Sequence, residues 1–172
     1  VKLQLLNATG IIDQAGNSSS TLTYTSSALT VDREATVTVS DGGVTSNGSR
    51  VVFTGGNYIL NASGLSNGLT VAGTVGGVQD GQTVTVSVFA VDSLGNATGN
   101  PIYTSAPGTV TSGAWSAQLV RIGADGGLNL LADRTTYALK VQVQDVAGNT
   151  ATSTLNLGTR LSATLDVSSV KA

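Results

Sequence analysis

Apolar and polar residues alternate with a period of two along most of this chain. Residues 83–90 alternate valine and alanine with threonine, serine and phenylalanine. Residues 139–144 set leucine and valine against lysine and glutamine, and residues 36–40 set valine against threonine and serine. This period is typical of β-strands with one buried face and one solvated face. The pattern therefore predicts an all-β chain of antiparallel strands.

Short turn signals separate the alternating segments. Glycine and asparagine accept positive φ, so their pairs with aspartate or glycine favour tight turns. These pairs are Asp41-Gly42-Gly43, Asn47-Gly48, Asn67-Gly68, Asp80-Gly81 and Asp125-Gly126-Gly127. Between them we predict strands at 69–75, 83–91, 101–104, 108–112, 114–121, 135–144 and 150–157. Only the segment 122–132 has the composition of a helical turn.

Strands this short, with turns every 8–12 residues or so, predict a sandwich of two sheets. We expect two modules: a β-sandwich module over 1–67, permuted or partial, and a second module over 68–172 with a C-terminal extension strand. The linker-like residues 61–68 lie between them. The predicted core of the second module is Val71, Val84, Val86, Val88, Trp115, Leu119, Tyr137, Leu139, Val141 and Leu155.

The chain also repeats itself. Residues 2–5 followed by 13–22 echo residues 140–143 followed by 145–155, including a shared Asp-x-Ala-Gly-Asn. Residues 1–26 thus look like a closing hairpin that comes first. Either the sequence starts inside a repeat, or the first module has permuted strand order. The hairpin can then pack on residues 27–67, or it can complete a neighbouring copy by strand addition.

Composition narrows the possible functions. The chain has no histidine and no cysteine, which removes the usual catalytic triads and thiol mechanisms, so we expect no enzymatic activity. A net charge of −2 with scattered lysines and arginines argues against nucleic acid as a partner. No apolar run approaches the roughly 20 residues that a membrane helix needs, so no membrane insertion is expected.

The most specific motif is Asp-x-x-Gly-Asn, at residues 13–17, 92–96 and 145–149. One interpretation is a turn, in which aspartate accepts backbone hydrogen bonds and glycine takes a left-handed conformation. The other is calcium, which prefers carboxylate and carbonyl oxygens. If the two later loops follow the second and sixth strands of a sandwich, they meet at one pole. The candidate calcium ligands are Asp92, Asn96, Asp145, Asn149 and Asp166.

The aromatic residues also have two interpretations. Trp115 with Tyr103 or Tyr137 offers a platform for a sugar. A single tryptophan in an alternating strand is more typical of a core. Exposure of Trp115 and Tyr103 distinguishes the two.

The motifs of the second module follow an order that resembles a known family. They are Val71-Ala-Gly-Thr-Val75, Asp80-Gly-Gln-Thr-Val-Thr-Val86, Gly113-Ala-Trp-Ser116 and Tyr137 through Asn149. This order is similar to the bacterial immunoglobulin-like tandem repeats of large secreted surface adhesins and biofilm-associated proteins. The resemblance covers about residues 68–158. It implies tandem immunoglobulin-like antiparallel β-sandwiches, an extracellular location at the bacterial cell surface, and an extender role. Neighbouring repeats would be the partners, often with calcium at the junctions.

Two other functions stay open. One is a self-assembling extracellular filament subunit, built by strand complementation between copies. The other is a module that binds a host or cell-surface glycan or protein.

Overall fold

The computed structural model describes residues 4–5, 24–25, 34–122 and 126–162. The chain forms two compact units, residues 1–33 and residues 34–172. In the first unit, β1 (Gln4–Leu5) pairs antiparallel with β2 (Tyr24–Thr25). This contact is the one expected of a hairpin over residues 1–26, and the rest of that hairpin lies outside the described residues.

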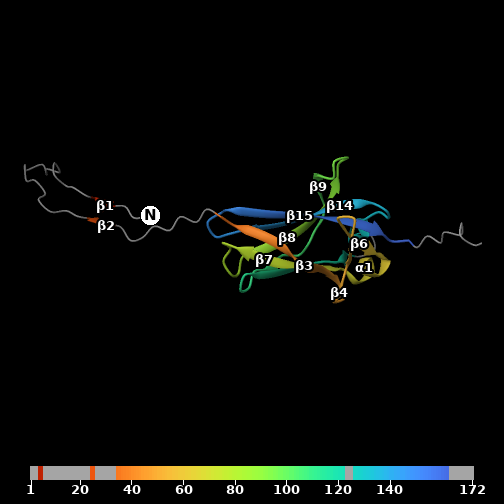
Figure 1. Ribbon diagram of the computed structural model, residues 1–172, viewed down its shortest axis with the longest axis horizontal. Coiled ribbons are helices and arrows are strands. Elements are labelled where there is room, and N and C mark those ends of the chain that lie inside the picture. Colours follow the sequence, from red (N-terminus) through yellow and green to blue (C-terminus); the bar gives the residue numbers. More distant parts are fainter. Residues whose placement is uncertain (1–3, 6–23, 26–33, 123–125, 163–172) are drawn as a thin grey trace, which may run out of the picture. The chain divides into compact units, whose positions relative to one another are not determined.

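The larger unit is built from two sheets, and Figure 1 shows β14 and β15 above β3 and β7. The larger sheet has the strand order β10-β8-β14-β15-β6-β5, with β9 also paired to β8. Its strands are β5 (Val52–Thr54), β6 (Asn57–Asn61), β8 (Thr83–Val91), β9 (Ala97–Thr104), β10 (Gly108–Thr109), β14 (Thr136–Gln144) and β15 (Thr150–Arg160). All its pairs are antiparallel except β15 with β6, which is parallel.

The second sheet has the order β11-β7-β3-β4 and is antiparallel throughout. Its strands are β3 (Thr36–Ser46), β4 (Ser49–Arg50), β7 (Leu69–Gly76) and β11 (Ala114–Leu119). A separate short pair joins β12 (Arg121–Ile122) to β13 (Gly126–Gly127). The described residues are therefore all-β apart from α1 (Ala62–Asn67) and the 3-10 helix η1 (Leu128–Leu130).

The core lies between the sheets, because its buried side chains come from strands of both. On β8 and β11, buried and more exposed residues alternate, as the sequence pattern predicts. The predicted core is confirmed except at Leu155, which is only partly buried against it. The largest fully buried side chains are Leu60, Leu69, Leu119, Leu128, Leu139, Leu157, Val44, Val71, Val84, Val86, Val88 and Val110.

Close approach of β3 and β7 depends on glycine. A Cβ atom added at Gly73 would lie 1.8 Å from the carbonyl oxygen of Thr38, so no larger residue fits there. The register between these strands shifts between Val39 and Val44. Asp41-Gly42-Gly43, expected as a turn, is instead this irregularity inside β3. Gly42 has a φ of 74°, which lets the chain bulge without leaving the strand.

Residues 61–68 form a capped helix rather than a linker. The Asn61 side chain accepts a hydrogen bond from the backbone nitrogen of Gly64 at 2.8 Å, and Gly68 ends the helix with a φ of 80°. This helix connects β6 of one sheet to β7 of the other.

The boundary between compact units also differs from the expected one. It lies between Arg33 and Glu34, not at 67/68. The reason is pairing across the expected boundary: β3 pairs with β7, and β6 pairs with β15. The seven strands predicted within 69–157 are confirmed, with ends shifted by a few residues.

Candidate functional site

The loop from Asp145 to Asn149 joins β14 to β15 and is closed by its own first and last residues. Asn149 donates from its backbone nitrogen to Oδ1 of Asp145 at 2.8 Å, and from Nδ2 to Oδ2 at 2.7 Å. The Asp145 backbone nitrogen donates to the Asn149 carbonyl oxygen at 3.0 Å. Gly148 takes a φ of 91°. Each motif residue thus has the role expected of it in a turn.

The loop from Asp92 to Asn96, between β8 and β9, repeats this arrangement. Oδ1 of Asp92 accepts hydrogen bonds from the backbone nitrogens of Leu94 and Asn96, both at 2.9 Å. Oδ2 accepts from Nδ2 of Asn96 at 3.4 Å, and Gly95 has a φ of 84°. The recurring motif therefore encodes the same local structure twice.

Hydrogen bonding lowers the pKa of both carboxyl groups. At Asp145 the main cause is the Asn149 side chain, followed among the hydrogen bonds by the Asn149 backbone, while desolvation acts in the opposite direction. At Asp92 the main cause of the lowered pKa is the backbone N–H of Asn96. N–H donors aimed at a carboxylate favour its charged form. Both loops are therefore stabilised by an ionised aspartate.

The two loops do not meet, contrary to the prediction that they share a pole. β8 and β14 are antiparallel neighbours, with Tyr137 opposite Ala90 and Val143 opposite Val84. Asp92 follows the end of β8 and Asp145 follows the end of β14, so they lie at opposite ends of the sheet. The nine residues of β14, about 30 Å of strand, separate them.

This separation bears on the calcium hypothesis. Ca²⁺ takes about six to eight oxygen ligands, and each loop alone contributes one carboxylate whose oxygens already face N–H donors. Among the described residues, no group of three or more acidic, histidine or cysteine side chains could hold a metal. Asp166 and the first motif copy, residues 13–17, lie outside the described residues. Calcium binding at Asp92, Asn96, Asp145 and Asn149 stays a prediction.

Trp115 belongs to the core. It is 3% exposed, and its Nε1 donates to the carbonyl oxygen of Thr74 at 3.3 Å. Tyr103 is half-buried, and its hydroxyl accepts a hydrogen bond from the backbone nitrogen of Val120 at 3.3 Å. A sugar platform on Trp115 is therefore excluded by burial.

A set of polar residues that belongs to no sequence motif fixes the end of β15. Asp133 Oδ1 accepts hydrogen bonds from the backbone nitrogens of Leu161 at 2.6 Å and Arg134 at 2.9 Å. Its Oδ2 accepts one from the Ser162 hydroxyl. The pKa of Asp133 is lowered, chiefly by Ser162 and then by Leu161. One carboxylate thus connects the loop before β14 to the chain leaving β15.

Thr159 extends this connection into the interior. It is fully buried, and its hydroxyl donates to the carbonyl oxygen of Ala132 at 2.6 Å while accepting from the Thr135 nitrogen at 2.9 Å. The Ala132 nitrogen donates to the Tyr137 hydroxyl at 2.7 Å. Threonines are frequent throughout this chain and Asp133 is one of nine aspartates, so no local signal marks these two. We call Ala132, Asp133, Thr135, Tyr137 and Thr159 the exit cluster.

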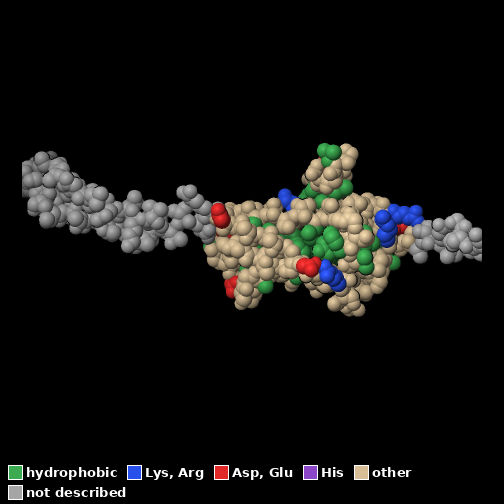
Figure 2. Space-filling view, viewed as in Figure 1, with side chains coloured by type: hydrophobic (Ala, Val, Ile, Leu, Met, Phe, Trp, Pro, Cys, Tyr) green, Lys and Arg blue, Asp and Glu red, His purple; other side chains and the backbone are tan. Residues whose placement is uncertain are grey.

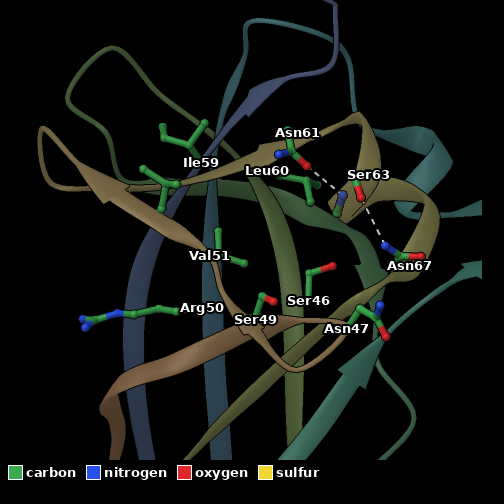
Figure 3. A pocket seen from close by; sticks show the side chains of 12 residues that line it. Ser46, Asn47, Ser49, Arg50, Val51, Ile59, Leu60, Asn61, Ser63 and Asn67 are labelled. Carbon is green, nitrogen blue, oxygen red and sulfur yellow. Dashed lines mark hydrogen bonds between the residues drawn. The ribbon is translucent and has the colours of Figure 1, made fainter.

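A polar pocket of about 220 Å³ lies between the β3–β4 turn and α1. Figure 3 shows Ser46 and Ser49 on one side of it and Leu60, Asn61 and Ser63 on the other. A second hollow of about 260 Å³ adjoins it and shares Asn47 and Asn67 with it. Asn47-Gly48 and Asn67-Gly68 are both turn signals in the sequence, but the proximity of the two asparagines depends on the fold.

The solved structures that are similar to this chain include two bacterial adhesins. No protein-family model and no curated protein matches it. One similar solved structure comes from a 1.5-MDa bacterial ice-binding adhesin studied for its retention at the host cell surface; it is 28% identical with a TM-score of 0.42. The match covers 94% of this chain and 41% of that one.

A second similar structure is a Ca²⁺-stabilized adhesin that helps an Antarctic bacterium reach out and bind ice. It is 28% identical with a TM-score of 0.36, and the match covers 89% of this chain and 31% of that one. No helix within the described ranges is long and apolar enough to cross a membrane. The chain is thus similar to parts of two large bacterial adhesins, and it spans less than half the length of either solved chain.

Proposed function

We propose that residues 34–162 form an immunoglobulin-like sandwich that acts as a spacer in an extracellular bacterial adhesin. The observation that carries this proposal is the path of the chain, which enters the unit at one pole and leaves it at the other (Figure 1). The adhesin assignment rests on the ordered motifs of residues 68–158.

The two poles are defined by pairing. Glu34 lies beside Gly77, just past the end of β7, and Thr36 pairs with Gly76. Gln79 follows closely and accepts a hydrogen bond from the Val146 nitrogen, which places the start of β15 at the same pole. β15 then runs for 11 residues, about 35 Å of strand, to Arg160 at the opposite pole. Copies joined end to end would therefore extend along one axis.

Strand order supports the immunoglobulin-like part of the proposal. Immunoglobulin sandwiches keep strands A, B and E in one sheet and C, F and G in the other. If β7 is B, then β8, β11, β14 and β15 correspond to C, E, F and G in these sheets. The A strand is divided: β3 pairs with β7, and β6 pairs in parallel with β15.

A second feature of the fold points the same way. Immunoglobulin-like sandwiches commonly carry a tyrosine near the start of strand F whose hydroxyl bonds to backbone a few residues upstream. Tyr137 has this position at the start of β14, and its hydroxyl accepts from the Ala132 nitrogen at 2.7 Å.

This geometry suits a module under tension. Pulling Glu34 and Ser162 apart loads β3 and β15 along their own axes. The hydrogen bonds of β3 with β7, and of β15 with β14 and β6, then share the force together rather than opening one after another. The exit cluster and its Asp133 contacts hold the chain where the force arrives.

Single-molecule pulling tests the proposal on the full chain. Because the sequence has no cysteine, Glu34→Cys with Ser162→Cys gives unique attachment points at opposite poles. We expect one cooperative unfolding event that releases roughly 400 Å of chain. The matched control attaches at Glu34→Cys and Val146→Cys, both at one pole, where the strands are peeled apart. The control should unfold at a clearly lower force. Equal forces in the two geometries would contradict a spacer role.

A further inference from the structure

The pocket beside α1 contains an unused hydrogen-bonding group. Within the described residues, the Ser46 hydroxyl is the one buried side-chain polar atom without a hydrogen-bond partner. Buried polar groups nearly always have partners, so an orphan indicates a missing water or ligand. In Figure 3 this hydroxyl points into the space below Leu60 and Ser63. The interior of the pocket therefore offers a hydrogen-bonding position to a polar group of a ligand.

Further neutral groups surround the same space. Asn61 uses its Oδ1 to accept from Gly64, and its amide nitrogen has donors to spare. Asn67 uses Nδ2 to donate to the Ser63 hydroxyl at 3.2 Å, which leaves its carbonyl oxygen for another donor. Together with Ser46, the pocket offers both donors and acceptors at close range, as a polyhydroxylated molecule requires.

The charges of the lining residues argue against both a divalent cation and an anion as the ligand. No carboxylate lines either hollow, so a divalent cation would lack the ligands it prefers. Arg50 is the only charged lining residue. It forms an ion pair with Asp41 and extends away from the pocket in Figure 3. The lining therefore favours a neutral ligand over an anion.

The volume of the pocket and its apolar lining limit the class of ligand further. A volume of about 220 Å³ holds roughly seven waters, less than a drug-sized ligand needs. Val51 and Leu60 supply apolar wall beside the polar groups. A single sugar ring combines hydroxyls with apolar C–H faces on this scale.

We propose that these two adjoining hollows bind a neutral saccharide, with one ring on each side of the shared residues Asn47 and Asn67. Ser46, Asn61 and Ser63 contact the ring in the first hollow. Thr70 and Gln118 line the second hollow and contact the next ring. This is a binding activity beyond the spacer role, and it uses none of the residues that define the two poles.

Amide NMR titration of the full chain tests the proposal. The probes are glucose, galactose, cellobiose and lactose, each raised to about 100 mM because a shallow neutral site is expected to bind in the millimolar range. We expect saturable shifts confined to residues 46–52, 59–70 and 118–120, with a disaccharide binding more tightly than its monosaccharide. Glucuronate and glucosamine, the charged probes, should bind no more tightly than glucose.

Two variants connect the shifts to the pocket. Ser46→Ala and Asn67→Ala should each weaken binding about fivefold, the equivalent of one neutral hydrogen bond. Ser46→Ala should melt no lower than the parent, because it removes a hydroxyl without a partner. The matched control Asn100→Ala, on exposed β9, should bind like the parent. No saturable shift with any neutral probe, or binding unchanged in both pocket variants, would overturn the proposal. Either result would leave the pulling experiment unaffected.

Discussion

The hydroxyl of Tyr137 accepts a hydrogen bond from the backbone nitrogen of Ala132, five residues earlier, at 2.7 Å. The ring of Tyr137 is buried in the core, so this bond ties the loop before β14 to the sandwich interior. The same loop residue receives the Thr159 hydroxyl on its carbonyl oxygen. Ala132 is therefore held from both backbone groups, and β15 is fixed through it.

Replacing Tyr137 with phenylalanine should isolate this bond. The ring keeps its packing, but the Ala132 N–H loses its partner at a partly buried site. We expect the free energy of unfolding to fall by about 1–3 kcal/mol in urea titrations. Tyr103→Phe is the control, because its hydroxyl accepts a longer bond of 3.3 Å at an exposed site. A loss at Tyr103 equal to that at Tyr137 would contradict the anchoring role.

Trp115→Ala should be among the most damaging single substitutions. The side chain is 3% exposed in the core, and truncating a buried tryptophan costs about 3–5 kcal/mol. Circular dichroism during urea unfolding measures the loss. Phe53→Ala is the matched aromatic control, since Phe53 lies on edge strand β5 and is 55% exposed. Its cost should be far smaller. Similar losses at both positions would mean that burial does not set the contribution of these rings.

The lowered pKa values of Asp92, Asp133 and Asp145 predict acid sensitivity. A group whose pKa is lower in the folded state stabilises the fold above its unfolded pKa. That contribution is lost as the pH falls through the folded value. Unfolding free energy should therefore decrease from about pH 4 downward.

Asp145→Asn tests whether the Asp145 carboxylate contributes to this loss of stability at low pH. The variant should be less stable than the parent at neutral pH, because the turn loses its ionised acceptor. The difference in unfolding free energy should shrink as the pH falls below 4 or so, where the parent carboxylate is protonated as well. A difference that stays constant across this range would show that the Asp145 charge does not contribute.

The local structure of each segment could be predicted from the sequence, but the pairing of the strands could not. Alternation at Val84, Val86 and Val88 identified β8 and its buried face, because that information lies within the strand. Which strand lies beside β8, and in which direction, depends on contacts far along the chain. The antiparallel neighbour β14 is what separates Asp92 from Asp145. The Asp-x-x-Gly-Asn turns were readable from sequence, whereas a site shared between them was not.

The pocket and the exit cluster could not be predicted from the sequence either, because both depend on contacts between residues far apart along the chain. Ser46 and Ser63 lie on different elements, and nothing in a serine-rich chain distinguishes them before folding brings them together. The helix at residues 62–67 was not predicted, because its composition is typical of turns and linkers. Its asparagine cap and closing glycine are also turn residues, so they predicted a linker.

Calcium can be tested one loop at a time. The loops lie at opposite ends of the sheet, so any effects of Asp92→Asn and Asp145→Asn on calcium-dependent melting should be additive. A loop that binds should stabilise the parent by about 2.7 kcal/mol at 100 times its Kd, and its own variant should abolish that gain. If the parent melts identically in millimolar Ca²⁺ and in chelator, neither loop holds calcium.

Deletion of residues 1–33 tests how the hairpin relates to the sandwich. Residues 1–33 and 34–172 are separate compact units, so the truncated chain should keep its fold. We expect its unfolding free energy, followed by the fluorescence of buried Trp115, to stay within about 1 kcal/mol of the parent. A large loss would mean that the hairpin completes the core of the sandwich.

Light scattering on the full chain tests for strand addition between copies. The core of the sandwich comes from residues 35–161, so it needs no strand from a neighbouring copy, and we expect a 17.1 kDa monomer at every concentration. A mass that rises with concentration, and that falls back when residues 1–33 are removed, would instead support the filament alternative, because a heterologous contact that does not close continues from copy to copy.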